Sequence, residues 1–404
     1  MRDWGLGIGR DWIFPLRLPC LPCLPCLPCL PTPYSLIFMR KRIGILTSGG
    51  DCPGLNCVIR AVVSHATLTY DWEVLGIPYA TQGLLERQTI ALNCHGWDLR
   101  GIDPLLNMGG TILGTINKGD TLSRVDEMLA SYEALGLDGL IAIGGDGSLG
   151  IINQLAQKGN WNLVAIPKTI DNDVALTERA IGFDTAVNTI VDALNRLTFT
   201  AASHDRVMVV EVMGRSAGHL ALHAGIAGGA DVILIPELEY TIKGLCQHLA
   251  ELRDRWRRKF GIIVVAEGAK LCVDDMCNLG NKEIKTDSAT ASLPTPKCGK
   301  GQYIAEQIAF CSRDMIDTRV SVLGHIQRGG IPSALDRLTA TVFGKAAVDL
   351  IAQDKYGQML AWQNGQVVSV PIQEAVAQSP LHVDPHGYLV QSARSLGIYV
   401  GEKS

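Results

Sequence analysis

The sequence predicts an α/β protein with mostly parallel sheets and helices on both sheet faces. Short apolar runs alternate with segments of helical spacing, which is typical of this class. Glycine-rich or polar turns follow several apolar runs, where such folds place their sites. The 404 residues exceed one ordinary hydrophobic core, so we expect two domains.

In the first half, the apolar runs and the helical patterns take turns. We expect strands over residues 43–46, 139–143 and 163–166, with Pro167 ending regular strand pairing. We expect helices beginning at Pro53, near Leu122 and near Ser148. A strand followed by a glycine turn and a helix N-terminus is a favourable place for an anion.

A second α/β half begins near residue 181. Apolar residues at helical spacing predict helices over about 187–197, 219–226 and 333–352. Apolar runs predict strands over 207–212, 232–235, 262–265 and 319–323. Residues 270–300 are polar and without periodicity, so we interpret them as a surface insertion. Beyond about residue 365 we expect one strand and a terminal helix.

Composition restricts the partners. The chain is 47% hydrophobic and 19% charged, as in soluble globular proteins, and its net charge of −4 gives no field that attracts nucleic acid. One basic run, Arg255 to Lys259, is interpreted as a solvated helix face. No apolar run is long enough to cross a bilayer, so neither nucleic acid nor membrane is expected as a partner.

The 12 cysteines do not form the pattern of a secreted disulfide framework. Four belong to one tandem repeat and eight are scattered, so we expect a reducing, cytoplasmic compartment.

Residues 1–38 differ from the rest of the chain. Leu-Pro-Cys occurs four times, ending at Cys20, Cys23, Cys26 and Cys29, and the spacing resembles an iron–sulfur run. A proline before every cysteine favours an extended, disordered tail instead, and prolines also interrupt any signal-peptide core. We expect Met39 to be the functional start, with residues 1–38 absent from the native protein.

Side chains at the predicted strand ends suit phosphate chemistry. Glycines at 49, 50, 109, 110, 145 and 147 let backbone approach a phosphate, and Asp146, Asp171 and Asp173 can hold a metal or take a proton. Arginines and His325 supply positive charge. Such a set suits two phosphorylated reactants bridged by Mg²⁺.

A dinucleotide site is the rival interpretation. Gly145 to Gly150 matches G-x-G-x-x-G, and Asp171 follows about 20 residues later. Asp146, however, would repel a bound pyrophosphate unless a cation lay between them, which favours a magnesium nucleotide over NAD. No P-loop of the Walker type and no convincing zinc spacing are present.

Five motifs occur in order along the chain: Thr47–Asp51, Gly144–Ser148, Pro167–Asp173, Met213–Arg215 and Gly324–Gly330. Together they resemble the phosphofructokinase family, and the resemblance extends from Met39 onward. The resemblance implies two similar Rossmann-like three-layer domains with the active site in the cleft between them. It also implies phosphoryl transfer to the 1-hydroxyl of fructose 6-phosphate.

The resemblance assigns roles residue by residue. Asp171 resembles the catalytic base, with Arg215 and Lys168 as further catalytic residues, and Asp146 resembles the Mg²⁺ ligand. The donor contacts are expected at Gly50, Gly145, Asp146, Gly147, Ser148, Asn117 and Lys118. The sugar-phosphate contacts are expected at Thr169, Ile170, Asp171, Arg206, Met213, Gly214, Arg215, Glu267, Arg319, His325, Ile326, Gln327 and Arg328.

The implied domains are a donor domain over 39–180 plus about 329–375, and a sugar-phosphate domain over 181–328 plus about 376–404. Arg206 and Arg319 match arginines that reach the sugar phosphate of a neighbouring subunit, so a homotetramer or homodimer is expected. Arg60 and Asp231 match effector-site positions, but Ser64 replaces an arginine, so we expect weak or altered allosteric control by ADP and phosphoenolpyruvate.

The donor is open between ATP, pyrophosphate and ADP. Gly147 is similar to the nucleotide type, whereas Lys168 is similar to the pyrophosphate type, and ATP is favoured. Asn117 and Lys118 replace an arginine and an aromatic residue of bacterial ATP enzymes. Two remoter alternatives are another GGDG-bearing kinase, of the NAD or diacylglycerol type, and a non-catalytic sugar-phosphate-binding subunit.

Overall fold

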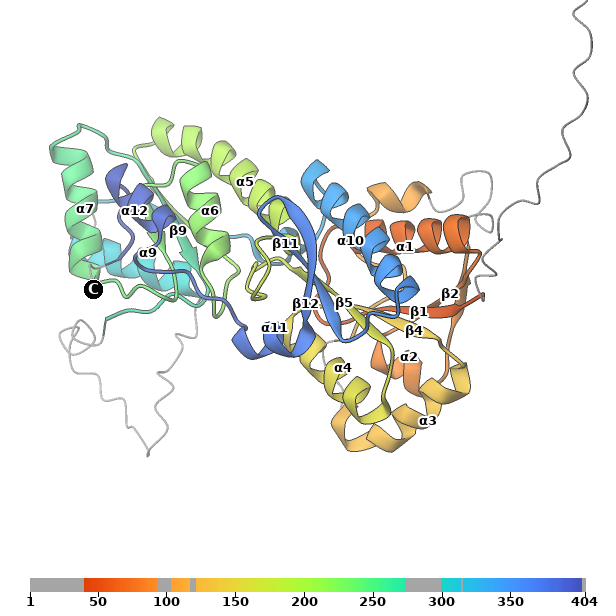
Figure 1. The fold of residues 1–404 in the computed structure, drawn as a ribbon. Coiled ribbons are helices and arrows are strands. Elements are labelled where there is room, and N and C mark those ends of the chain that lie inside the picture. The colour runs from red at the N-terminus through yellow and green to blue at the C-terminus, as the bar shows by residue number, and fades with distance from the viewer. Residues whose placement is uncertain (1–39, 94–102, 117–120, 273–298, 314, 402–404) are drawn as a thin grey trace, which may run out of the picture. The chain divides into compact units, whose positions relative to one another are not determined.

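The computed structural model describes residues 40–93, 103–116, 121–272, 299–313 and 315–401, whose strands form two sheets (Figure 1). The predicted tail over 1–38 and most of the predicted insertion lie outside the described residues.

The first sheet is mostly parallel. Its order is β12-β11-β5-β4-β1-β2-β3, and β6 pairs with β5 beyond this path. Only β3 and β12, the outermost strands, pair antiparallel with their neighbours. The strands are β1 (Arg42–Thr47), β2 (Glu73–Ile77), β3 (Ile90–Leu92), β4 (Gly139–Gly144), β5 (Leu163–Thr169), β6 (Ile181–Gly182), β11 (Gln358–Gln363) and β12 (Gln366–Pro371).

Helices cover both faces of this sheet, because successive strand residues point to opposite sides. Ile141 and Ile143 pack in the core that contains α1 and α10, whereas Leu140 and Ala142 pack in the core of α2, α3, α4 and α11. These helices are α1 (Leu55–Tyr70), α2 (Thr81–Leu85), α3 (Val125–Leu135), α4 (Asp146–Gly159), α10 (Ala334–Ala352) and α11 (Ile372–Gln378), with 3₁₀ turns η2 (Asp103–Asn107) and η3 (Thr121–Arg124).

The second sheet is entirely parallel, in the order β10-β7-β9-β8. Successive residues of its strands again point to opposite faces. Val210 and Val264 pack in the core that contains α5, α6 and α12, whereas Val209 and Val265 pack in the core that contains α7 and α9. The elements are α5 (Phe183–Ser203), β7 (Val207–Val212), α6 (His219–Ala227), β8 (Val232–Leu234), α7 (Ile242–Asp254), β9 (Gly261–Ala266), α9 (Lys300–Cys311), β10 (Thr318–Val322), η4 (Gly324–Arg328) and α12 (Tyr388–Ser395). The α/β class with mostly parallel sheets is therefore confirmed.

Several predicted boundaries were wrong. Strand β5 continues through Pro167, which lies opposite Gly144 at the end of β4. Pairing with β11 stops at Ala165, so Pro167 needs no N–H on that side. Helix α1 begins two residues after Pro53, whereas α4 begins at Asp146, near Ser148 as predicted.

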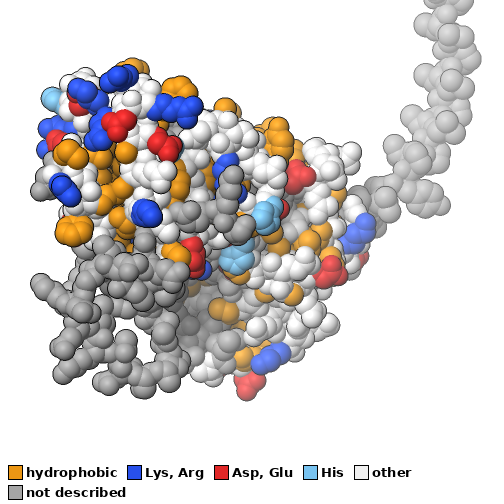
Figure 2. Space-filling model, turned by 90° about the vertical axis from the view of Figure 1, so that its left-hand side faces the viewer, with side chains coloured by type: hydrophobic (Ala, Val, Ile, Leu, Met, Phe, Trp, Pro, Cys, Tyr) orange, Lys and Arg blue, Asp and Glu red, His pale blue; other side chains and the backbone are white. Residues whose placement is uncertain are grey.

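The basic run Arg255 to Lys259 is not a helix face, because α7 ends at Asp254. Arg258 instead forms an ion pair with Asp231, 2.7 Å between Nη1 and Oδ1. Figure 2 shows Lys and Arg side chains gathered toward the upper left of one face, with acidic side chains among them. No described helix is long and apolar enough to span a membrane.

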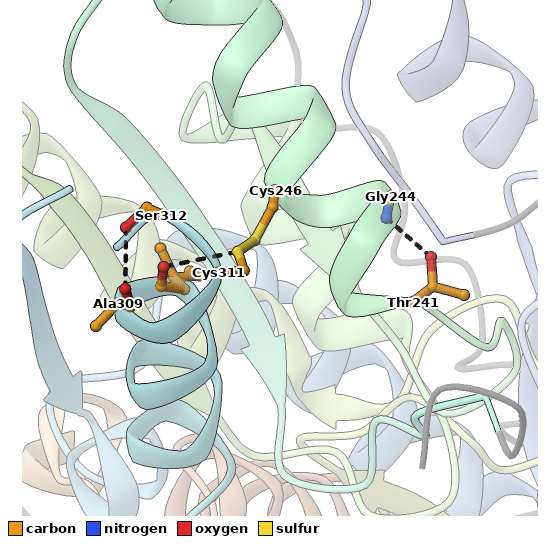
Figure 3. The surroundings of a disulfide bond; sticks show 7 residues. Thr241, Gly244, Cys246, Ala309, Cys311 and Ser312 are labelled. Atoms are coloured by element: carbon orange, nitrogen blue, oxygen red, sulfur yellow. Dashed lines mark hydrogen bonds between the residues drawn. A yellow bond between two sulfur atoms is a disulfide. The ribbon is translucent and has the colours of Figure 1, made fainter. Parts of the chain in front are cut away.

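A disulfide joins Cys246 of α7 to Cys311 at the end of α9 (Figure 3). The scattered cysteines did not predict this bond. Cys52 and Cys57 are free thiols in the core beneath the first sheet.

Candidate active site

One cavity of about 420 Å³ lies beyond the carboxyl ends of β1, β4 and β5. Parallel strands place the turns that follow them at one sheet edge, so three separate motifs meet there. The lining residues are Ser48, Gly49, Gly50, Thr81, Ile116, Gly145, Asp146, Gly147, Ser148, Ile151, Ile152, Lys168, Thr169, Asp171, Asp173 and Arg328. Asp146 and Asp171 thus face the same space.

The turn after β1 brings backbone close to the other motifs. Gly49 has φ +83, and a Cβ there would lie 2.8 Å from Oγ of Ser148. A Cβ at Gly50 would lie 2.7 Å from Nη1 of Arg328. The two glycines therefore allow an approach that any side chain would obstruct.

Helix α4 points its N-terminus into the cavity. Gly145 is its N-cap and Asp146 its first residue, and no side chain caps the free backbone N–H groups there. A Cβ at Gly147 would meet no atom within 4 Å, so the protein's own packing does not require this glycine. Uncapped N–H groups and open space at a helix start are features that suit a bound phosphate.

The loop after β5 is held by its own side chains. The backbone N–H of Asp171 donates to Oγ1 of Thr169 at 3.0 Å, and Thr169 Oγ1 donates to Asp173 at 3.2 Å. Asn172, with φ +50, turns its amide away from the cavity to Ala180 and Glu178. This leaves Asp171 and Asp173 facing the cavity.

Asp171 is placed to accept a proton. Its Oδ1 is buried and accepts no hydrogen bond from any residue that the structure describes. Burial, and then the charge of Asp173, raise the pKa of Asp171 to about 6. Burial and the charge of Asp146 also raise the pKa of Asp173.

Two cations border the carboxylates. Lys168 is 4% exposed and its amine donates to the carbonyl of Gly50, and burial lowers its pKa. Arg328 donates to the carbonyl of Asp51 at 3.2 Å. The cavity therefore combines the uncapped N-terminus of α4 with three carboxylates and two cations.

The other predicted sugar-phosphate residues do not line this cavity. Arg215 extends into solvent, its side chain 89% exposed, with Nε 3.8 Å from Oε1 of Glu267. His325 and Ile326 are exposed in η4. Arg206 and Arg319 both pair with Asp317.

Two of the residues predicted to contact the sugar phosphate are fully buried. The Ile170 side chain is fully buried in the core, so only its backbone can reach a ligand. Gln327 is also fully buried; it accepts from the N–H of Met213 at 3.2 Å and donates to the carbonyl of Gly324 at 2.9 Å. Gln327 thus supports the turn at Met213 and Gly214. Asn117 and Lys118 lie outside the described residues.

Sequence reasoning missed the apolar side of the cavity. Ile116 follows the second glycine-rich loop, and Ile151 and Ile152 lie on α4. Ile151 is an exposed large apolar side chain on an amphipathic helix, which was an available signal. Thr81 at the start of α2 carried no sequence signal.

Among the described residues, no group of three or more His, Cys, Asp or Glu side chains is arranged to hold a metal. Magnesium usually takes only one or two protein carboxylates and completes its shell with phosphate and water. Asp146, at the uncapped N-terminus of α4, could serve as the single protein carboxylate of such a magnesium ion.

Comparisons with known proteins agree with this geometry. A profile described as Phosphofructokinase matches residues 42–351. The chain is 82% identical over 366 residues to a Nostoc sp. protein named ATP-dependent 6-phosphofructokinase 2, covering 91% of this chain and 100% of that protein. It is 65% identical to an ATP-dependent 6-phosphofructokinase of Thermosynechococcus vestitus, covering 90% and 94%.

Solved structures are also similar. A phosphofructokinase of Saccharomyces cerevisiae has a TM-score of 0.68 at 29% identity over 84% of this chain, which spans 45% of that longer chain. A pyrophosphate-dependent phosphofructokinase of Nitrosospira multiformis has a TM-score of 0.73 at 18% identity, covering 90% and 93%, and shows the fold alone. The motifs, the fold and these matches agree: the chain belongs to the phosphofructokinase family.

Proposed function

We propose that the chain is an ATP-dependent 6-phosphofructokinase that converts fructose 6-phosphate to fructose 1,6-bisphosphate in glycolysis. One observation carries the proposal: Asp171, with an unpartnered carboxylate oxygen, faces the same cavity as the uncapped N-terminus of α4, which suits donor phosphates. A base and a donor site in one space are what phosphoryl transfer requires.

In the proposed reaction, Asp171 takes the proton of the sugar 1-hydroxyl. The hydroxyl oxygen bonds to the γ-phosphorus as the bond to the β-phosphate oxygen breaks, and ADP leaves. Lys168 and Arg328 neutralise charge around the transferred group, and Arg215 supplies a further cation from the sugar side. Gly50 and Gly145 to Ser148 hold the donor phosphates.

Magnesium is the proposed cofactor, with Asp146 as its protein ligand. Bound there, the ion neutralises charge on the donor phosphates. Asp146 lies in the first turn of α4, so it can reach an ion shared with phosphates held by the helix start.

ATP is the proposed donor, and pyrophosphate or ADP are the alternatives. The open space at Gly147 supports ATP, because an aspartate there would occupy the α-phosphate position and repel it. Ile116 and Ile151 offer apolar surface that a base could use and pyrophosphate could not. The amine of Lys168 donates a hydrogen bond to the carbonyl of Gly50, so this lysine is weaker evidence for pyrophosphate as the donor.

The sugar-phosphate contacts are proposed at Thr169, Met213, Gly214, Glu267, His325 and Ile326, with the backbone of Ile170. Arg206 and Arg319, which do not reach the cavity of their own chain, are proposed to reach that of a neighbouring subunit in a homotetramer or homodimer. We place the enzyme in the cytoplasm, where its substrates occur.

Weak or altered effector control is also proposed. Asp231 is occupied: its carboxylate pairs with Arg258 and accepts from the N–H of Ile262 at 2.9 Å. An effector that needs this carboxylate must displace Arg258. An undiminished bacterial-type response to ADP and phosphoenolpyruvate in kinetic assays would count against this point.

The test is a parallel assay of fructose 6-phosphate phosphorylation with ATP, ADP and pyrophosphate, for the wild type, Gly147→Asp and Gly147→Ala. We expect the wild type to use ATP, Gly147→Ala to keep most of this activity, and Gly147→Asp to lose at least about tenfold through charge repulsion. Wild-type preference for pyrophosphate or ADP would overturn the donor. Failure with every donor, or phosphorylation of NAD or diacylglycerol instead, would overturn the function.

A further inference from the structure

The segment Ser379–Val383, between α11 and α12, is hydrogen-bonded to the loop that carries Asp171 and Asp173. The N–H of Leu381 donates to the carbonyl of Asp173 at 2.6 Å. The N–H of Ala175 donates to Oγ of Ser379 at 2.8 Å. We name this segment the connector.

The same connector is hydrogen-bonded to the turn after β7. Nε2 of His219 lies 3.0 Å from the carbonyl of Leu381, and Nδ1 of His382 lies 2.9 Å from the carbonyl of Ser216. Both contacts can form only with the ring nitrogen donating, since the carbonyls accept. Residues of one short segment are thus hydrogen-bonded both to the loop after β5 and to the turn and helix start after β7.

Glu237 completes the second set of contacts. Its Oε1 accepts from the N–H of Gly218 at 2.9 Å and from the N–H of Val383 at 2.8 Å. One carboxylate oxygen therefore joins the connector directly to the turn that holds Met213, Gly214 and Arg215. A Cβ at Gly218 would lie 2.7 Å from Oε2 of Glu237, so only glycine admits the carboxylate there.

Glu237 is an unusual residue to find in this place. Its side chain is 7% exposed, no Lys or Arg of the described residues forms an ion pair with it, the ring of His382 comes no nearer than 4.0 Å to Oε1, and Oε2 has no hydrogen-bond partner among the described residues. Burying a carboxylate with so little compensation is unfavourable. The compensation for this burial is the pair of hydrogen bonds that Glu237 accepts from the backbone N–H groups of Gly218 and Val383.

We propose that Glu237 is a positioning residue that couples the sugar-phosphate turn to the Asp171 loop through the connector. The proposal rests on the function proposed above. When Glu237 holds both N–H groups, Met213 to Arg215 are fixed relative to the base, and binding of fructose 6-phosphate is transmitted to Asp173 through Leu381. Without it, the two loops move independently.

The test compares Glu237→Ala, Glu237→Gln and a matched control, Thr241→Ala. Gln keeps a carbonyl oxygen for both N–H groups, whereas Ala removes the acceptor. Thr241 is the N-cap of α7, and its hydroxyl oxygen accepts from the N–H of Gly244 at 2.9 Å (Figure 3). Thr241→Ala therefore also removes a side-chain acceptor of a backbone N–H, at a position close to Glu237 in the sequence.

Two readouts are measured: KM and kcat for both substrates, and amide hydrogen exchange by mass spectrometry. For Glu237→Ala we expect KM for fructose 6-phosphate to rise on the order of tenfold, as expected for a lost bond to a charged acceptor. Exchange should become faster in 213–219, in 379–384 and in 171–176. Glu237→Gln should restore both readouts, and Thr241→Ala should change neither KM nor exchange in those segments.

Unchanged exchange in 171–176 would overturn the coupling, and faster exchange with unchanged KM would overturn the role in sugar binding. The exchange readout does not need activity. If the wild type fails to phosphorylate fructose 6-phosphate yet Glu237→Ala loosens all three segments, the proposed function falls and the mechanical link stands.

Discussion

Asp171 illustrates how burial sets chemistry at the scale of one residue. A carboxylate buried beside a second carboxylate is harder to ionise, so its pKa rises from 3.8 to about 6. In the proposed reaction, only the ionised form can accept the proton of the sugar hydroxyl. Below about pH 6 the active fraction therefore falls, approaching tenfold for each pH unit.

The acid limb of kcat/KM should consequently depend on the neighbouring charge. Asp173→Asn removes the second-largest cause of the raised pKa, so we expect the limb to move to lower pH. Asp354→Asn is the control, because Asp354 pairs with Lys41 elsewhere on the surface. A limb that stays in place or moves to higher pH in Asp173→Asn would remove Asp171 from the titration.

The same shift has a consequence for stability. A folded pKa above the unfolded value means that ionising Asp171 disfavours folding, so the penalty is absent below pH 3.8 and complete above about pH 6. Asp171→Asn, which carries no charge, should therefore unfold at a temperature no lower than the wild type at pH 7.5. A clearly lower unfolding temperature would show that the carboxylate supports the fold.

At the scale of elements, hydrogen bonds join the N-terminal ends of α5 and α10 near β5. Asp336, in the first turn of α10, accepts from the N–H groups of Gly182 at 3.0 Å and Thr185 at 2.8 Å. Ser333, the N-cap of α10, donates to Asp184 at 2.6 Å. Gly182 belongs to β6, which pairs with Lys168 and Thr169, so this cap also supports the site.

Removal of the shared cap should be costly. Asp336→Ala leaves buried N–H groups without acceptors, and we expect a loss of roughly 3 kcal/mol in the free energy of unfolding. Ser333→Ala should lose only about 1 kcal/mol, as for an ordinary N-cap. Denaturant titration measures both, and equal losses in the two variants would contradict the special role of Asp336.

The strands and helices that could be predicted were those with a clear apolar pattern in the sequence. Strands such as Ile262–Val265 are continuous apolar runs and were found, because a parallel sheet buries both of its faces. Helices α7 and α9 were not predicted, and β11 was not separated from β12. Pro167 was misjudged because the sequence does not show where a neighbouring strand stops pairing.

The sequence predicted which motifs meet at the candidate site, because these motifs follow parallel strands. It did not predict the direction in which each side chain of a motif points. Asp146 and Asp171 lie 25 residues apart in sequence, in separate motifs, and do share a cavity. Ile170 lies in the motif of Asp171 and Gln327 in that of Arg328, yet both side chains are fully buried, since the direction of a side chain in a turn depends on tertiary packing. The connector could not be predicted, because backbone groups supply most of its contacts.

At the scale of the whole molecule, the proposed function includes sites shared between subunits. Arg206 and Arg319 pair with Asp317 and do not line the cavity of their own chain. If they complete a neighbour's site, mixed oligomers of Arg319→Ala and Asp171→Asn subunits should regain activity, because some sites receive both intact residues. Mixed Asp146→Asn and Asp171→Asn subunits should not, since both residues line one cavity of one chain.

Complementation is measured as turnover after joint refolding of equal amounts, against each variant refolded alone. No gain in the Arg319→Ala mixture would place the site within a single chain.

The central claim is that Asp171 accepts the proton while ATP is held at α4. Its most direct test is the turnover of Asp171→Asn with ATP and fructose 6-phosphate at pH 7.5. We predict a loss of roughly two to four orders of magnitude in kcat, with KM for both substrates close to wild type. A variant that keeps wild-type turnover would contradict the account.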